Sequence, residues 1–141
     1  AGFWDVANLS DAPLVATHSN VHALCEIGRN LTDKQLDAIK ASDGLVGLNF
    51  AVGFLRQDGG WGTDIPLTTL VRHIDYLVDR LGIDRVGLGS DFDGAKIPDA
   101  IADVTGLPKL VHALSEAGYD ESALRKLTHE NWLRVLELTW K

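Results

Sequence analysis

The chain has 141 residues, of which 45% are hydrophobic, so it can bury the core of one ordinary domain. Its formal net charge is −7, which argues against nucleic acids and anionic membranes as partners, because both attract clustered Lys and Arg. A single cysteine, Cys25, excludes an internal disulfide framework, and no apolar stretch reaches the ~18 residues that a membrane span requires.

The first half of the chain is predicted to alternate helices with short strands. Residues 2–10 are predicted to form the end of a helix, and a first strand follows at residues 14–17. Thr32 stands three residues before a glutamine, which is the spacing of a capping box and predicts a helix at residues 32–41. A second strand is predicted at residues 45–50, where the continuous apolar run is typical of a parallel strand buried on both faces.

The second half continues this alternation. Residues 51–65 are predicted to form a glycine-rich loop, either a mobile substrate lid or a plain flexible excursion. Apolar residues at helical spacing predict a helix at residues 66–81, and a third strand is predicted at residues 85–89. Strands that alternate with helices predict an α/β fold with a parallel sheet. Further helices are predicted to begin at caps Thr105 and Asp120 and at about Asn131.

Chemically capable side chains follow the first and the third predicted strands. His18 follows the first, and imidazole is both a common metal ligand and a general base. Asp91 and Asp93 follow the third, between glycines, where α/β barrels carry their active sites. Taken singly, each residue has an ordinary alternative. His18 could be satisfied by backbone groups, Arg29 could be a solvated cation, and the aspartates could be solvated carboxylates of an Asp-Gly turn.

Three other residues are weighed as chemical candidates and are given lesser roles. His22 lies four residues from His18, but it follows a strand end rather than lying on a clear helix, so chelation by His22 is the weaker alternative. His73 falls inside an amphipathic helix, where a hydrogen-bonded structural histidine is expected. Cys25 could form a catalytic Cys–His pair, but a buried inert thiol is the preferred interpretation.

Several short blocks occur in an order that resembles the renal (membrane) dipeptidase family, whose members are zinc peptidases with a barrel fold. The Ser-Asp-Phe-Asp-Gly block and the spacing from His18 to Arg29 are specific, whereas the Asn-Trp-Leu-Arg tail is supportive only. The resemblance covers essentially the whole chain but reaches only the C-terminal half of the family's domain. The blocks are Pro13–Asn20, Arg29–Asp33, Gly44–Phe50, His73–Leu77, Gly87–Gly94 and Asn131–Val135.

This resemblance implies the C-terminal half of a (β/α)8 barrel, with parallel strands and outer helices. Residues 1–141 are then the C-terminal part of a single metallo-dipeptidase barrel domain. A closed barrel needs about 250 residues, and only three strands are predicted here. The chain also lacks a methionine at position 1. We therefore expect it to be part of a longer polypeptide whose N-terminal half completes the barrel.

The resemblance also implies a role for each candidate residue. Family members hold two zinc ions that share a bridging carboxylate and activate a water to hydrolyse a dipeptide. His18 matches a zinc ligand, and Arg29 matches the arginine that receives the free carboxylate of the substrate. Asp91 matches the acid that moves a proton between the metal-bound water and the leaving amine. Asn20 and Asp93 are expected to be structural or to hold these residues in place without contacting the substrate.

The chain departs from the family pattern in its metal ligands. The His-x-Asp motif, the bridging Glu and the other metal histidine of the family are not in this sequence, so His18 is the one expected ligand. One imidazole cannot hold two zinc ions. We therefore expect the isolated chain to be inactive unless an N-terminal partner supplies the remaining ligands.

Two alternative functions and several partners follow from this interpretation. The chain could belong to another binuclear metal hydrolase on the same barrel, acting on cyclic amides or esters. It could also be a non-catalytic barrel half that serves assembly or binding. The expected partners are a dipeptide substrate and the N-terminal half of the barrel, with no nucleic acid and no membrane segment. Self-association into a homodimer is left open, and a cytoplasmic location is expected.

Overall fold

Three short parallel strands form the centre of the structure, a computed structural model that describes residues 2–58 and 60–140. The strands lie side by side in chain order, with Val46 of the middle strand paired with Val86 of the third. Each strand falls inside the run that the sequence predicts, so the α/β fold with a parallel sheet is confirmed. The strands are β1 (Val15–Ala16), β2 (Leu45–Leu48) and β3 (Val86–Leu88).

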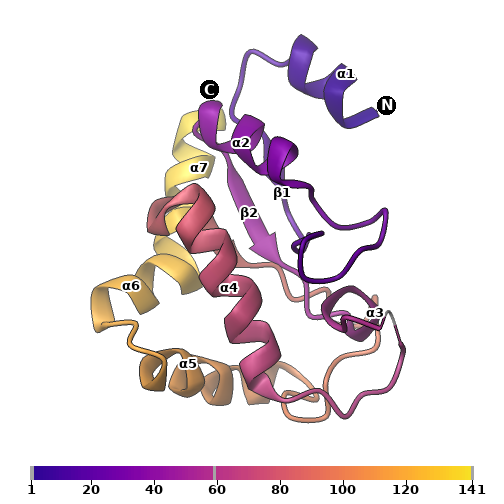
Figure 1. Ribbon diagram of the computed structural model, residues 1–141. Helices are drawn as coiled ribbons and strands as arrows, with labels where there is room; N and C mark the ends of the chain where they lie inside the picture. The colour runs from indigo at the N-terminus through magenta and orange to yellow at the C-terminus, as the bar shows by residue number, and fades with distance from the viewer. Residues whose placement is uncertain (1, 59, 141) are drawn as a thin grey trace.

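Helices surround this sheet, and α1 lies at one end of the molecule, apart from α4, α5 and α6 (Figure 1). No helix in the described part of the chain has the length and apolar character needed to cross a membrane. The α-helices are α1 (Gly2–Leu9), α2 (Asp33–Ala41), α3 (Val52–Leu55), α4 (Leu67–Leu81), α5 (Leu107–Glu116), α6 (Glu121–Arg125) and α7 (Asn131–Thr139). Shorter helical segments are η1 (Ile83–Arg85), η2 (Val104–Gly106) and the π-helix η3 (Lys126–Glu130).

Helices α2 and α4 cover one face of the sheet. Val46, Leu48 and Val86 lie on that face and are fully buried. The apolar side chains of α4 recur at helical spacing, so they form one stripe that packs against the strands and α2. This packing confirms the helix predicted at residues 66–81. The main helical partners in the core are Leu36, Ile39, Leu70, Ile74, Leu77 and Leu81.

The indole ring of Trp132, from α7, packs against glycines on the opposite face of the sheet. Side chains alternate along a strand, so Gly47 and Gly87 point away from the face that carries Val46 and Val86. A Cβ atom at Gly87 would lie 2.6 Å from Trp132 Nε1, and one at Gly47 would lie 2.9 Å from Trp132 Cζ2. Glycine at position 87 therefore makes room for the ring, whose Nε1–H donates to Leu88 O at 3.1 Å, and glycine at position 47 makes room for the Thr17 carbonyl as well as the ring.

The start of the predicted glycine-rich loop is a short helix, α3, rather than a loop. Gly53 weakens the helical signal in the sequence. Tertiary contacts compensate, because the Phe54 carbonyl at the end of α3 accepts hydrogen bonds from Asn20 and Asn30. Gly59, which the prediction places in the loop, lies outside the described residues. The described residues on either side of it, 56–58 and 60–66, are irregular.

Two predicted helix caps have different outcomes. The Asp120 side chain accepts a hydrogen bond from Ala123 N at 2.8 Å, which confirms Asp120 as the cap of α6. The prediction that Thr105 is a cap is wrong. Thr105 lies inside η2, and Asp103 is the N-cap of η2. The carboxylate of Asp103 accepts hydrogen bonds from both the backbone N–H and the hydroxyl of Thr105.

Candidate functional site

The segments that follow the three strands meet at one edge of the sheet. Beyond β1, Ser19 N donates to Gly47 O in the adjacent segment at 2.8 Å. Beyond β3, Gly89 N donates to Leu48 O at 2.9 Å. The strands are parallel, so their carboxyl ends point the same way, and the polar residues that follow them are brought together here. We call this region, formed by residues 17–20, 29, 49–50 and 89–91, the strand-end edge.

His18 is half-buried at this edge, and its ring is oriented by its neighbour. His18 Nδ1 lies 2.7 Å from the hydroxyl of Thr17. The other ring nitrogen, Nε2, has no hydrogen-bond partner among the described residues, which is the arrangement that metal-binding histidines use. His18 thus fits one ligand position. The described residues contain no group of three or more His, Cys, Asp or Glu placed to hold a metal ion, and His22 completes none with His18.

Arg29 reaches the same edge from the loop before α2. Its Nη1 donates to Ser19 Oγ at 3.1 Å, and its Nη2 donates to the backbone carbonyl of His18 at 3.2 Å. The guanidinium also lies over the ring of Phe54, with Cζ 5.7 Å from the ring centroid. The Arg29 side chain remains exposed to solvent. Its charge is therefore held in a defined place while N–H groups stay available to an incoming carboxylate.

Asp91 is half-buried after β3 and has an unusual backbone conformation. Its φ is 59°, in the left-handed region that non-glycine residues seldom occupy. The turn is closed by Gly94 N, which donates to Asp91 O at 3.2 Å. Asp91 Oδ2 accepts a hydrogen bond from Asn49 Nδ2 at 3.0 Å. Strained backbone conformations of this kind cluster at functional sites.

Asn20 and Asn49 are fully buried and connect the first strand end to Asp91. Asn20 Oδ1 accepts from the backbone N–H of Asn49 at 2.8 Å, and Asn20 Nδ2 donates to the Asn49 carbonyl at 2.9 Å. Asn20 is thus a buried residue that holds the backbone of Asn49 in place. Asn49 is not among the site residues predicted from the sequence. The sequence contains a signal for it, because Asn49 is the polar residue that follows the second apolar strand, as His18 and Asp91 follow the first and the third.

Asp93 is placed differently from the other predicted residues. Its side chain is exposed and makes no hydrogen bond or ion pair with a described residue. Its φ of 64° shows a second left-handed residue in the turn that follows β3. The structure therefore brings His18, Asn20, Arg29 and Asp91 to the strand-end edge, and among the described residues Asp93 makes no side-chain hydrogen bond to Asp91.

Two residues weighed in the sequence are buried in the interior. His73 Nδ1 accepts from Val21 N at 3.3 Å, and Nε2 lies 3.2 Å from Leu55 O, which confirms a hydrogen-bonded structural histidine. Burial is the main cause that lowers the pKa of His73 to about 4. Cys25 is also buried, and burial raises the pKa of its thiol, so the expected buried thiol is confirmed.

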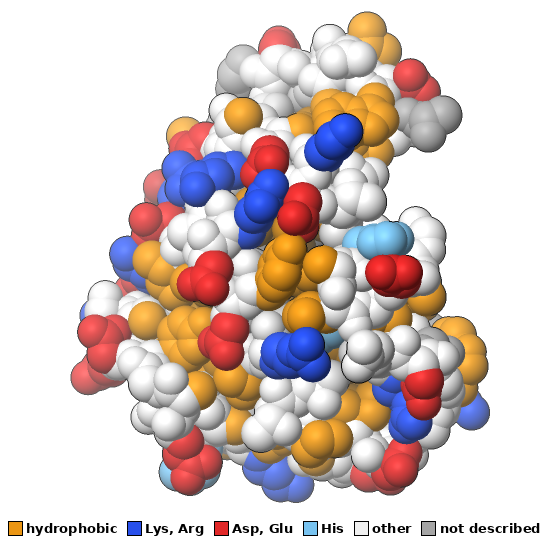
Figure 2. Space-filling model, in the orientation of Figure 1, with side chains coloured by type: hydrophobic (Ala, Val, Ile, Leu, Met, Phe, Trp, Pro, Cys, Tyr) orange, Lys and Arg blue, Asp and Glu red, His pale blue; other side chains and the backbone are white. Residues whose placement is uncertain are grey.

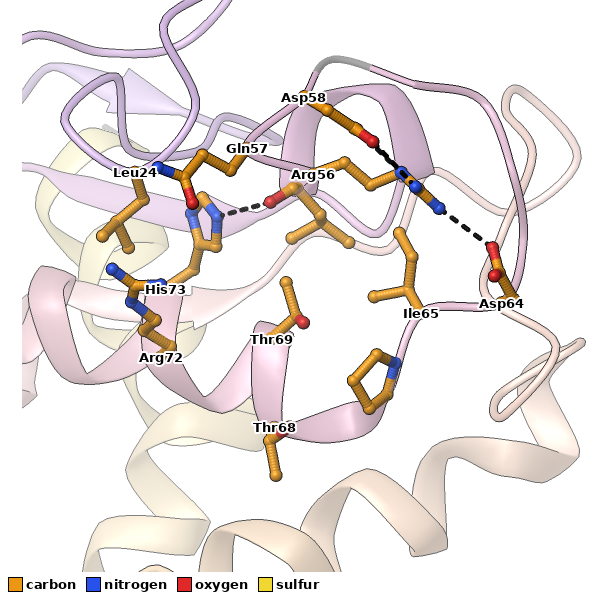
Figure 3. A pocket seen from close by; sticks show the side chains of 12 residues that line it. Leu24, Arg56, Gln57, Asp58, Asp64, Ile65, Thr68, Thr69, Arg72 and His73 are labelled. Carbon is orange, nitrogen blue, oxygen red and sulfur yellow. Dashed lines mark hydrogen bonds and ion pairs between the residues drawn. The ribbon is translucent and has the colours of Figure 1, made fainter.

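A cavity of about 660 Å³ lies between the segment after α3 and the start of α4 (Figure 3). Arg56 lines it and forms ion pairs with Asp58 at 2.8 Å and with Asp64 at 2.9 Å. These pairs join the two described sides of the glycine-rich segment. The described residues that line the cavity include none of the predicted site residues. The cavity is therefore a separate feature, and the strand-end edge remains the candidate site.

Comparison with known proteins gives several strong similarities. The sequence model of the family described as "Membrane dipeptidase (Peptidase family M19)" matches residues 1–140. An uncharacterised protein from the pqqA 5′ region of Klebsiella pneumoniae is 58% identical over 139 residues, which are 99% of this chain and 51% of that protein. Dipeptidase ataJ from Aspergillus terreus is 36% identical over 136 residues, which are 94% of this chain and 32% of that protein.

The fold is also similar to that of solved structures. The crystal structure of a metallo peptidase from Rhodobacter sphaeroides, liganded with a phosphinate mimic of the dipeptide L-Ala-D-Ala, superposes with a TM-score of 0.97 at 61% identity. The match covers 99% of this chain and 40% of that one. The chain therefore spans about half or less of the length of the proteins it matches here.

Proposed function

Because the chain belongs to the membrane dipeptidase family, peptidase family M19, we propose that it supplies one part of the active site of a zinc-dependent dipeptidase. The observation that carries this proposal is the strand-end edge, where Arg29 donates to the His18 carbonyl and Asn49 donates to Asp91, so that His18, Arg29 and Asp91 lie at one edge of the sheet. The metallo peptidase from R. sphaeroides binds a dipeptide mimic, which supports a dipeptide as the substrate class for this chain as well.

We propose that the chain is the C-terminal half of a (β/α)8 barrel, as a single domain shared with further polypeptide. In the described residues, β1 and β3 are the outer strands of the sheet, and each has β2 as its partner. The apolar side chains exposed on α1 and β1 are those of Trp4, Val6, Leu9 and Val15. Figure 2 shows hydrophobic groups on the upper part of the molecule. Further strands would pair with these edges and cover this surface.

Zinc would be held by His18 together with ligands from the rest of the barrel. The fit rests on the free Nε2 of His18 and on the Thr17 hydroxyl that orients the ring. The described residues offer no complete ligand group, and we propose that further polypeptide supplies the remaining ligands. When bound, zinc supplies Lewis-acid chemistry that polarises a carbonyl and makes water a better nucleophile at neutral pH.

We assign substrate binding to Arg29 and proton transfer to Asp91. Arg29 binds the free carboxylate of the dipeptide through its exposed N–H groups. Asp91 accepts a proton from the attacking water as the new C–O bond forms, and it returns that proton to the amine nitrogen as the C–N bond breaks. A cationic group held at this edge favours a substrate with a free carboxylate over the cyclic amides or esters of the alternative hydrolase.

Replacing Asp91 tests this function. In the complete polypeptide, Asp91→Asn preserves the shape of the side chain and removes the base, so kcat for a dipeptide should fall by roughly 10²–10⁴. Zinc content, measured on the same purified sample, should not change. The matched control is Asp79→Asn, an exposed aspartate on α4, which should keep the parental kcat. An Asp91→Asn enzyme with near-parental kcat, or one that has lost its zinc, would overturn the assignment.

A further inference from the structure

The orientation of the Asn49 side chain is determined by its surroundings. Asn49 is fully buried, and its Oδ1 accepts the backbone N–H of Ala51 at 2.6 Å. A flipped amide would place its NH2 group against this N–H donor, so the oxygen must face Ala51. The NH2 group therefore points the other way, at Asp91 Oδ2, 3.0 Å distant. Asn49 can only donate to the carboxylate.

Asn20 keeps Asn49 in this place. Its side-chain amide makes paired hydrogen bonds to the N–H and the C=O of Asn49, and its Nδ2 also lies 3.3 Å from Phe54 O. Asn20 is itself fully buried. Movement of Asn49 would leave several buried polar groups without partners, which is unfavourable. The donor aimed at Asp91 is thus held by contacts with the segments after β1 and β2 and with α3.

The two oxygens of Asp91 have different surroundings. Oδ2 accepts the Asn49 hydrogen bond. Oδ1 lies against Gly94, where an added Cβ atom would be 2.5 Å away, and it accepts no hydrogen bond from a described residue. The left-handed backbone of Asp91 and the turn closed by Gly94 N set the direction of the side chain. One oxygen is therefore anchored and the other is available.

We propose that Asn49 is a positioning residue, whose amide anchors Asp91 through Oδ2 so that Oδ1 carries the proton. This inference rests on the proposed function, in which Asp91 exchanges a proton with the water and the leaving amine. Asn49 itself touches neither of them. It limits the rotation of the carboxylate, so that Oδ1 keeps one direction while the C–O bond forms and the C–N bond breaks.

The substitution Asn49→Asp removes the amide donor and places a second carboxyl group beside Asp91, whereas Asn49→Ser removes the donor without adding charge. Asn49→Asp keeps the size of the residue and an oxygen acceptor for Ala51 N–H, and it replaces the NH2 donor by an oxygen that faces Asp91. In the complete polypeptide, kcat for a dipeptide should fall by roughly 10- to 100-fold, the usual effect of losing a supporting hydrogen bond at such a site. KM should stay unchanged, because Arg29 binds the substrate carboxylate, and zinc content should also stay unchanged.

A double substitution shows whether Asn49 acts through Asp91. If it does, Asn49→Asp should lower kcat no further in a protein that already carries Asp91→Asn. If Asn49→Asp does not fold, Asn49→Ser replaces it, since its hydroxyl can accept from Ala51 N–H but is too short to reach Asp91. The structural control is Asn30→Ser, another buried asparagine, which bonds to the carbonyls of Cys25 and Phe54 and should lower thermal stability without this fall in kcat.

The possible failures can be told apart. If Asp91→Asn is inactive and the folded Asn49 variant keeps the parental kcat, the inference about Asn49 is overturned and the proposed function stands. The same holds if KM rises while kcat is constant, or if Asn49→Asp lowers kcat equally with and without Asp91. If Asp91→Asn itself keeps near-parental kcat, the proposed function is overturned, and the inference is overturned with it.

Discussion

Each reactive side chain at the strand-end edge is oriented by a polar neighbour. The Thr17 hydroxyl lies against His18 Nδ1, and the Ser19 hydroxyl accepts from Arg29. The Asn49 amide donates to Asp91. At the scale of single residues, the site therefore consists of pairs in which one member orients the other. Such pairs reduce the number of side-chain arrangements that must be sampled before a substrate is bound productively.

Arg29→Lys tests the binding role of the guanidinium. Lysine keeps the positive charge but loses the planar fork that can hold a carboxylate through two parallel hydrogen bonds. We expect a loss of about 1.5–3 kcal/mol in dipeptide binding, which is roughly a ten- to hundred-fold rise in KM. The measurement is steady-state hydrolysis of a dipeptide and of the same dipeptide with an amidated C-terminus, for which the penalty should shrink.

The control for this prediction is Arg72→Lys, a change at an exposed arginine on α4 that lies outside the strand-end edge. It should leave the KM of both substrates unchanged. Equal penalties for the acid and the amide in Arg29→Lys would show that Arg29 does not bind the substrate carboxylate.

The sequence predicts some of these residues and not others. His18 and Asp91 are recognisable because each follows an apolar run and belongs to a residue type with its own chemistry. Asn49 has a neutral amide, and its importance lies in which way that amide points. This direction depends on Ala51 N–H and on Asn20, which is 29 residues away in the chain, so only the folded structure reveals it.

The start of α7 gives a physical account of the Asn-Trp-Leu-Arg tail at the scale of elements. Asn131 Nδ2 donates to the carbonyls of Ile83 and Val86, both at 2.7 Å. The Arg134 guanidinium donates to the carbonyls of residues 43, 44 and 84. Together with the Trp132 indole, these donors fasten α7 to the sheet and to the turns before β2 and β3. The tail is therefore structural, and it supports the strands whose far ends carry the site.

His73 joins α4 to two other segments and makes stability depend on pH. The ring is neutral when it accepts from Val21 N and donates to Leu55 O. Its pKa is about 4 in the folded protein, mainly through burial, compared with 6.5 for an exposed histidine. Between these values the unfolded chain binds the proton and the folded protein does not. The stabilisation is therefore complete above pH 6.5 and is lost as pH falls towards 4.

We expect His73→Gln to flatten this dependence, since its amide can accept from Val21 N and donate to Leu55 O without titrating. Between pH 6.5 and 4, the parent should lose about 3 kcal/mol more in its free energy of unfolding than the variant. Denaturant unfolding of the complete polypeptide at a series of pH values measures this difference. Parallel curves for the two proteins would contradict the prediction.

Local signals in the sequence predict elements better than signals that depend on distant contacts. The Thr32 cap of α2 was predictable because Thr32 N–H donates to Gln35 Oε1, three residues away. The cap at Thr105 was misplaced because Asp103, two residues earlier, accepts the hydrogen bonds. Helix α3 is not predicted from the local sequence, because its Phe54 carbonyl is satisfied by asparagine side chains that precede it by 24 residues or more.

At the scale of the whole molecule, we propose that the chain forms one side of a site that further polypeptide completes. Its sheet has outer strands β1 and β3 in the described residues, and the site residues lie at the carboxyl ends of these strands. His18 is the described residue best placed to bind zinc, while the described residues hold no complete metal group. The α/β fold with parallel strands was predictable from the sequence. The network behind Asp91 was not, because it depends on tertiary contacts.

The zinc content of the complete polypeptide and its His18→Ala variant tests the central claim most directly. A ligand bonds the metal itself, so its removal should lower the zinc bound per folded protein and abolish dipeptide hydrolysis. The control His112→Ala, a change at an exposed histidine on α5, should keep parental zinc and activity. Elemental analysis of protein shown to be folded by circular dichroism gives the answer. Parental zinc content in folded His18→Ala would contradict the placement of the metal site at the strand-end edge.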